Sequence, residues 1–116
     1  MNIEELQQIA MSLPGVTEDV KWQNDLCFSV GTKMFSVIGL NQSPTSAIFK
    51  VPQDDFETLS QQEGFKPAPY LARYNWVFVD DLNRISKKEW QQYIEQSYNL
   101  VKEKLSPKLK KQFNLN

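Results

Sequence analysis

Cationic and aromatic side chains alternate in the segment between residues 66 and 76. Its members are Lys66, Arg73, Tyr70, Tyr74 and Trp76. Cations beside exposed aromatic rings can hold phosphate groups and stack nucleic-acid bases. Because Tyr and Trp beside strands also pack against protein cores, a structural role for these rings stays open. Tyr70 and Trp76 are the stacking candidates, and each would stack only if its ring is exposed.

A second concentration of positive charge lies in the last third of the chain. Residues 84–116 contain eight basic and three acidic side chains, whereas residues 1–63 contain three basic and nine acidic ones. Such a segment can bind phosphate, because contact is local and screening acts within about 8–10 Å. A solvated, Lys-rich surface that favours a helix dipole and solubility is the alternative. This end of the chain contributes Lys108, Lys110 and Lys111 as auxiliary phosphate contacts.

The residue types on which many enzymes depend are scarce. The chain has no histidine and a single cysteine, Cys27, which removes imidazole bases, imidazole metal ligands, internal disulfides and Cys-rich zinc sites. Acidic pairs such as Asp54-Asp55 are adjacent and diverge on a helix or strand, so they form no carboxylate dyad. No glycine-rich nucleotide motif is present. We therefore expect no catalytic residues, no metal and no cofactor, and a protein that is not an enzyme.

Length and composition are those of one ordinary globular domain. The 116 residues are 41% hydrophobic and carry a net charge of −1, and single domains commonly contain about 100–150 residues. We expect one domain, residues 1–116, that is monomeric. The N-terminus lacks the basic segment of a signal peptide, and no apolar run reaches the ~18–20 residues that cross a bilayer. These features predict a cytoplasmic protein without membrane contact.

A helix and a short helical turn are predicted at the start of the chain. Asn2 is a candidate N-cap with Glu5 as its capping-box partner, and apolar residues recur at helical spacing over residues 3–13. Pro14-Gly15 ends this helix. The acids of Thr17-Glu18-Asp19 suit the positive end of a second, short helix.

Strands are predicted in the middle of the chain. Apolar residues alternate over residues 26–30 and a second strand covers residues 34–40, so the pair forms a hairpin around Gly31. Residues 47–51 form a third strand, and the short connections predict an antiparallel meander. A short helix over residues 54–59 follows, and residues 76–80 form the last strand. The segment between them has a structured loop with one turn of helix after Pro69.

The C-terminal third is predicted to be helical. Ser86 and Glu89 have the S-x-x-E spacing of a capping box, and an apolar stripe that begins at Trp90 predicts a helix over residues 87–105. Pro107 suits the start of a short closing helix over residues 108–113. Helices at both ends of the chain packed on an antiparallel sheet define the α+β class.

Five segments form an ordered pattern along the chain. They are residues 13–22, 27–35, 49–51, 67–77 and 97–101. In this order they resemble the MmcQ/YjbR family, and the resemblance extends over nearly the whole chain. It implies a small α+β domain with a frataxin-like fold and an arrangement described as a double wing.

The resemblance also implies DNA binding, which is predicted for the family from the double wing. With Lys66 added from the neighbouring loop, the candidate contacts are Lys21, Lys33, Lys50, Lys66 and Arg73. Two positions depart from the family pattern, because Asn75 stands where members often carry His and Gln23 where they often carry Gly. A role that needs an ionisable imidazole at position 75 is therefore absent.

These features favour a non-catalytic module that contacts the phosphate backbone of DNA. Backbone contacts give affinity without sequence choice, so we expect weak binding, about 10⁻⁴–10⁻⁶ M at physiological salt. A net-negative protein must concentrate its positive charge on one surface to attract a polyanion. The alternative is a domain that binds another protein or a small ligand, and an enzyme is the least favoured class.

Overall fold

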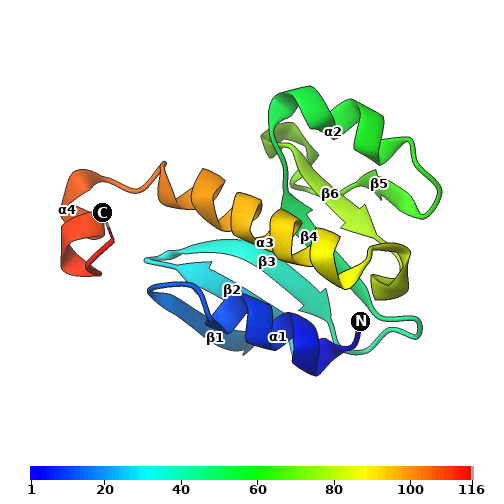
Figure 1. Ribbon diagram of the computed structural model, residues 1–116, viewed down its shortest axis with the longest axis horizontal. Helices are drawn as coiled ribbons and strands as arrows, with labels where there is room; N and C mark the ends of the chain where they lie inside the picture. The colour runs from blue at the N-terminus through cyan, green and yellow to red at the C-terminus, as the bar shows by residue number, and fades with distance from the viewer. Residues whose placement is uncertain (116) are drawn as a thin grey trace.

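The computed structural model describes residues 1–115 and contains one six-stranded antiparallel sheet with four helices (Figure 1). The strands are β1 (Val16–Lys21), β2 (Asp25–Val30), β3 (Lys33–Gly39), β4 (Ser46–Lys50), β5 (Phe65–Pro67) and β6 (Trp76–Val79), in the spatial order β1-β2-β3-β4-β6-β5. The helices are α1 (Ile3–Met11), α2 (Gln53–Ser60), α3 (Lys87–Lys102) and α4 (Pro107–Gln112), with 3-10 turns η1 (Ala72–Tyr74) and η2 (Leu82–Arg84). This architecture confirms the predicted α+β class.

One face of the sheet forms the core together with the helices. Alternate strand residues such as Phe28 and Phe49 are fully buried against α3, which crosses in front of the sheet in Figure 1. Trp90 of α3 is 0% exposed, as its place on the apolar stripe predicts, and its ring meets Phe49 edge-on at 5.5 Å. The core therefore fixes α3, and with it the C-terminal end of that helix, over the middle strands.

A β-bulge interrupts the pairing of β2 with β3. Phe28 pairs with Ser36 and Ser29 pairs with Met34, so Phe35 is an extra residue on β3. Its ring packs edge-on against Tyr98 of α3, with 5.5 Å between centroids. The bulge thus ties the beginning of β3 to the last turns of α3.

The capping box of α3 is present as predicted. The Ser86 side chain accepts from the Glu89 amide at 3.2 Å, and the Glu89 carboxylate accepts from the Ser86 amide at 3.4 Å. The helix ends at Lys102 and not at residue 105, because the chain tightens there and the Leu105 amide donates to the Lys102 carbonyl. Leu105 then packs against the turn between β2 and β3.

Two sequence-based expectations about secondary structure are wrong at the edges of the sheet. Thr17-Glu18-Asp19 begins no helix, because these residues lie in β1 and pair with β2 along its whole length. The preference of acids for a helix N-terminus is a weak local signal, and sheet pairing outweighs it. The segment before Pro69 also contains a strand, β5, which pairs with β6. The helical turn expected after Pro69 is present as η1.

The capping of α1 is confirmed in part. The Asn2 side chain accepts from the Glu5 amide at 2.8 Å, as an N-cap should. The Glu5 carboxylate, however, pairs with Lys87 of α3 at 3.6 Å, which links the two helices at the surface. Over residues 1–115, no helix has both the length and the apolar character that crossing a bilayer requires.

One end of the sheet gathers segments from the whole chain. Here β2 ends, β3 begins, β4 ends and β6 begins, because neighbouring strands are antiparallel. Gly31 turns the β2–β3 hairpin at a φ of +62°, and a Cβ there would come within 2.9 Å of Leu105. This close approach seats the end of α3, and α4 after it, on the same end of the sheet.

Candidate anion-binding site

Three lysines from three elements meet in a pocket at this end of the sheet. Lys33 begins β3, Lys50 ends β4, and Lys104 follows the last turn of α3. The pocket has a volume of about 270 Å³. We call it the lysine pocket, and its lining residues are Lys33, Met34, Lys50, Tyr74, Trp76, Val101 and Lys104.

Lys50 is the buried member of the lysine pocket. The residue is only 8% exposed, whereas Lys33 and Lys104 are exposed. Burial lowers the pKa of the Lys50 ammonium below its ordinary 10.5, and the positive charges of Lys104 and Lys33 lower it further. The charges that act on Lys50 are therefore of its own sign.

A hydrogen-bonded serine holds the backbone of Lys50 in place. The Lys50 amide donates to Ser97 Oγ of α3 at 2.9 Å, and that hydroxyl donates to the Phe35 carbonyl in the bulge at 2.5 Å. Ser97 is 0% exposed. One buried hydroxyl thus joins α3, β3 and β4 directly beneath the pocket.

Aromatic residues form a wall of the lysine pocket. Trp76 is the cross-strand partner of Lys50 and is only 6% exposed, so its ring is part of the wall and offers no free face. Tyr74 is 47% exposed, and the Arg73 guanidinium lies 4.9 Å from its ring centroid. Asn75, between Tyr74 and Trp76 in the sequence, adopts a φ of +66°, a conformation that Asn tolerates well.

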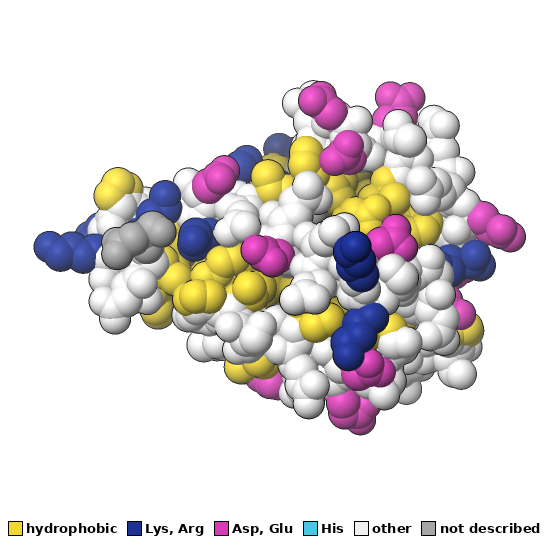
Figure 2. Space-filling model, viewed as in Figure 1, with side chains coloured by type: hydrophobic (Ala, Val, Ile, Leu, Met, Phe, Trp, Pro, Cys, Tyr) yellow, Lys and Arg dark blue, Asp and Glu magenta, His cyan; other side chains and the backbone are white. Residues whose placement is uncertain are grey.

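The remaining predicted cations fall into two groups. Lys108, Lys110 and Lys111 lie on α4, which shares its end of the sheet with the pocket. Figure 2 shows Lys and Arg side chains gathered around α4. We call this region the basic end, and it comprises Lys33, Lys50, Arg73, Lys104, Lys108, Lys110 and Lys111.

Lys66 and Lys21 lie outside the basic end. Lys66 belongs to the edge strand β5, on the sheet face away from the core, and its ammonium lies 4.8 Å from the Phe78 ring centroid. Lys21 pairs with Asp25 where β1 ends and β2 begins, at the opposite end of the sheet. The structure therefore does not bring these two cations to the pocket.

Tyr70 is the stacking candidate with a free ring. It is 98% exposed and adopts a φ of +67°, which is uncommon for a bulky residue. It lies between the end of β5 and η1, so it belongs to the same end of the sheet as Tyr74. Its ring is available to a ligand that approaches the basic end.

The cations of the basic end are free of acidic partners in the part of the chain that the structure describes. The two ion pairs found within residues 1–115 join Arg84 to Asp80 at 2.5 Å and Lys87 to Glu5 at 3.6 Å. Neither pair includes a lysine of the pocket. Positive charge at the basic end is thus left available for an external anion.

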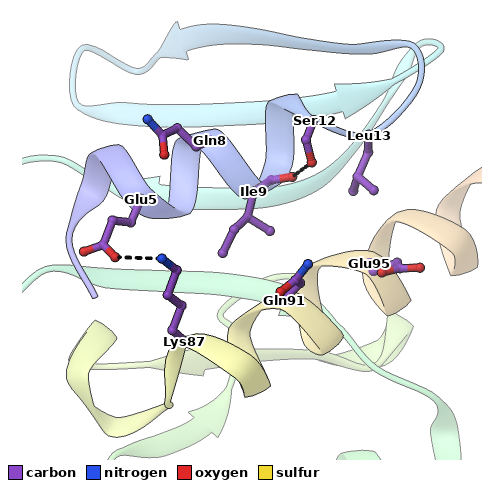
Figure 3. A pocket seen from close by; sticks show the side chains of 8 residues that line it. All are labelled: Glu5, Gln8, Ile9, Ser12, Leu13, Lys87, Gln91 and Glu95. Atoms are coloured by element: carbon purple, nitrogen blue, oxygen red, sulfur yellow. Dashed lines mark hydrogen bonds and ion pairs between the residues drawn. The ribbon is translucent and has the colours of Figure 1, made fainter.

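A groove between α1 and α3 is another of the hollows in the surface (Figure 3). It also measures about 270 Å³, and Ile9 of α1 and Leu13, just after that helix, face Gln91 and Glu95 of α3 across it. Its one cation, Lys87, is already paired with a carboxylate, as the dashed line in Figure 3 shows. The groove has no uncompensated positive charge, so the lysine pocket is the stronger candidate site.

Four residues that line the pocket were not among the candidates that the sequence supplied, namely Met34, Tyr74, Val101 and Lys104. Lys104 lies three residues after Val101 and therefore beside the buried stripe of α3, but the spacing alone does not reveal which strands this stripe covers. Tyr74 belongs to the aromatic loop, where the sequence analysis named only Tyr70 and Trp76 as stacking candidates. Sequence reasoning did supply Lys33, Lys50 and Trp76, which the structure brings together.

Comparisons with known proteins agree with this fold. The chain is similar to the protein DR2400 of Deinococcus radiodurans, which carries a DUF419 domain, with a TM-score of 0.87 at 23% identity over 99% of this chain and 89% of that one. It is also similar to a protein from Pseudomonas syringae, with a TM-score of 0.70 at 22% identity over 86% of this chain and 98% of that one. No curated protein matches it. The sequence model of the YjbR family matches residues 11–100, and the chain therefore belongs to the YjbR family.

Proposed function

We propose that this protein is a non-catalytic DNA-binding module that contacts the phosphate backbone with its basic end. The observation that carries the proposal is the convergence of Lys33, Lys50 and Lys104 without an acidic partner among the described residues. Ammonium groups neutralise phosphates and release counterions, which is the main source of sequence-independent affinity for DNA.

The arrangement of charge supports a local mode of binding. The net charge is only −1, yet the lysines of α4 extend the positive surface beyond the pocket. Interactions between exposed charges are screened within about 8–10 Å, so acids elsewhere on the molecule oppose this contact only weakly. The exposed ring of Tyr70 adds a surface on which an unpaired base can stack.

Lys66 and Lys21 are the outer contacts of this proposal. Both lie on the sheet face away from the core, Lys66 on one edge strand and Lys21 on the other. Along the strand direction Lys66 lies nearer to the basic end than Lys21 does, because Lys66 pairs with Phe78, two residues after Trp76. We therefore expect Lys66→Ala to weaken DNA binding more than Lys21→Ala.

Fluorescence anisotropy with a labelled DNA duplex at about 50 and 200 mM salt tests the proposal. We expect log K to fall with log salt at a slope of about −0.9 for each phosphate that the protein neutralises. Lys33→Ala with Lys104→Ala, and separately the triple change of Lys108, Lys110 and Lys111 to alanine, should each flatten the slope. The slope of log K against log salt should become less negative by about one for every phosphate that the variant no longer neutralises.

Lys88→Ala is the matched control. Lys88 is exposed in the first turn of α3, away from the basic end, so its removal should leave the slope unchanged. Absence of binding at low salt, or an equal loss in Lys88→Ala, would refute the proposal.

In the absence of DNA, the protein should elute from a size-exclusion column as a monomer of 13.5 kDa.

A further inference from the structure

We propose that the lysine pocket binds a single phosphomonoester group, the terminal phosphate of a nucleotide or of a nucleic-acid strand. The inference deepens the proposed function, because it names the ligand of the central site. It rests on the proposed function only where the phosphate is the end of a DNA strand. The other source is a free mononucleotide.

The charge of the pocket matches a dianion. Three ammonium groups line it, and both charges that act on the buried Lys50 are positive. Burying a cation is unfavourable unless an anion or hydrogen-bond acceptor compensates it. A phosphomonoester carries a charge of about −1.5 to −2 and three strong acceptor oxygens, whereas an internal phosphodiester of DNA carries a single charge. The monoester therefore compensates the cluster more completely.

The size and walls of the pocket suit a small phosphorylated group. Its volume of about 270 Å³ lies just below the range of about 300–1,000 Å³ typical of sites for drug-sized ligands. Met34, Trp76 and Val101 supply apolar surface beside the ammonium groups. A phosphate with part of its sugar or base fits such a space, and a duplex does not enter it.

The backbone that carries Lys50 and Trp76 is fixed before a ligand arrives. Lys50 is anchored through its amide to the buried Ser97, which also holds the bulge at Phe35. Trp76 is fixed by its cross-strand pairing with Lys50. Groups held in this way lose little conformational freedom when a ligand arrives.

Helix electrostatics explain only part of the cluster. A lysine after the last turn of α3 is stabilised by the carbonyl end of the helix dipole, which accounts for Lys104. Lys33 and Lys50, however, come from strands, and Lys50 is directed to the same pocket despite its burial. A bound anion accounts for all three positions.

Isothermal titration calorimetry of the full chain tests the inference with matched pairs of ligands. Adenosine 5′-monophosphate is compared with adenosine, and a short oligothymidylate with a 5′-phosphate is compared with the same strand with a 5′-hydroxyl, all at one ionic strength. We expect the phosphorylated member of each pair to bind about 10- to 100-fold more tightly. Preference within the mononucleotide pair alone identifies a free nucleotide as the source, and preference within the strand pair identifies a strand end.

Variants assign the effect to the pocket. Lys50→Met should abolish the preference for the phosphorylated ligand, and Lys104→Met, at an exposed position, should reduce it without affecting folding. Lys88→Met is the control that should retain it. Equal affinity for both members of each pair, or a preference that survives Lys50→Met and Lys104→Met, would overturn the inference.

The outcome is separable from that of the proposed function. If a duplex with 5′-hydroxyl ends binds with a lysine-dependent salt slope but a terminal phosphate adds nothing, the inference fails and the DNA-binding proposal stands. If the phosphorylated ligands bind and the duplex does not, the inference stands and the proposed function fails.

Discussion

At Lys50 the requirements of binding and of stability oppose each other. Most of the residue is withdrawn from water, and its charged neighbours Lys33 and Lys104 repel its ammonium. We expect Lys50→Met to raise the free energy of unfolding by about 0.5–2 kcal/mol, because an apolar side chain of similar length removes both the burial of a charge and the repulsion between like charges. The same change should weaken phosphate binding. Urea unfolding followed by circular dichroism measures the gain. Lys88→Met, at an exposed position, should change stability by less than about 0.5 kcal/mol.

The gain from Lys50→Met should depend on pH. The pKa of Lys50 lies below 10.5 in the folded chain and returns to that value on unfolding. Between the two pKa values the unfolded chain binds more protons, so the stability of the unsubstituted protein rises with pH in this interval. The advantage of Lys50→Met should therefore shrink as the pH rises toward 10.5. A constant advantage would contradict like-charge repulsion and burial as its cause.

Ser97 is the second residue on which the pocket depends. Ser97→Ala removes the acceptor of the Lys50 amide and the donor to the Phe35 carbonyl, and it leaves both groups buried. We expect a loss of about 1–3 kcal/mol in the free energy of unfolding, together with weaker phosphate binding. Ser36→Ala is the comparison, since the buried Ser36 hydroxyl donates to the Ile48 carbonyl alone at 2.9 Å. A larger loss in Ser36→Ala than in Ser97→Ala would argue against this role.

Among the elements, α3 connects the core to the site, and Trp90 is its main anchor. The indole is fully buried and its N–H donates to the Leu82 carbonyl at 2.8 Å. Trp90→Ala should lower the free energy of unfolding by about 3–5 kcal/mol. Trp90→Phe retains most of the ring but leaves the carbonyl without its donor, so it should cost about 1–3 kcal/mol. Calorimetric melting shows which of the two variants loses more stability. An unchanged melting temperature in Trp90→Ala would show that α3 is misplaced.

The strands that sequence reasoning predicted are those with buried residues. β2, β3, β4 and β6 form the middle of the sheet, and their alternating or continuous apolar residues are visible in the sequence. The two strands that it missed, β1 and β5, are the edges of the same sheet. Nearly every residue of β1 is exposed, so no alternation marks it, and β5 has three residues and ends in Pro67.

Some residues of the candidate site were predictable from the sequence, but their arrangement was not. The family resemblance supplied Lys33 and Lys50, and the aromatic loop supplied Trp76. Their meeting depends on the register between β4 and β6 and on the bulge that adds one residue to β3, and neither is visible in the sequence. Lys104 lies in the pocket because α3 ends at Lys102, a boundary that apolar spacing alone places three residues later.

At the scale of the whole molecule, the places where charges are paired or unpaired bear more on anion binding than the net charge of −1 does. Arg84 and Lys87, near the start of α3, are paired with Asp80 and Glu5. Such exposed pairs contribute little to stability, but they neutralise that end of the molecule. The basic end, about one helix length away, has no such compensation within residues 1–115. Under the proposed function, we therefore expect an anion to bind where several such cations converge, at the basic end.

The three tryptophans allow this polarity to be tested in a single experiment. Trp76 lines the lysine pocket, Trp90 lies in the core, and Trp22 is 68% exposed in the β1–β2 turn at the opposite end of the sheet. A DNA duplex is titrated into the protein labelled with nitrogen-15, and the indole N–H signals are followed in the proton–nitrogen NMR spectrum. The signal of Trp76 should shift. The Trp22 signal should stay in place despite its greater exposure, because it is remote from the basic end. A shift of Trp22 without one of Trp76 would locate DNA at the Lys21 end of the sheet and would contradict binding through the basic end.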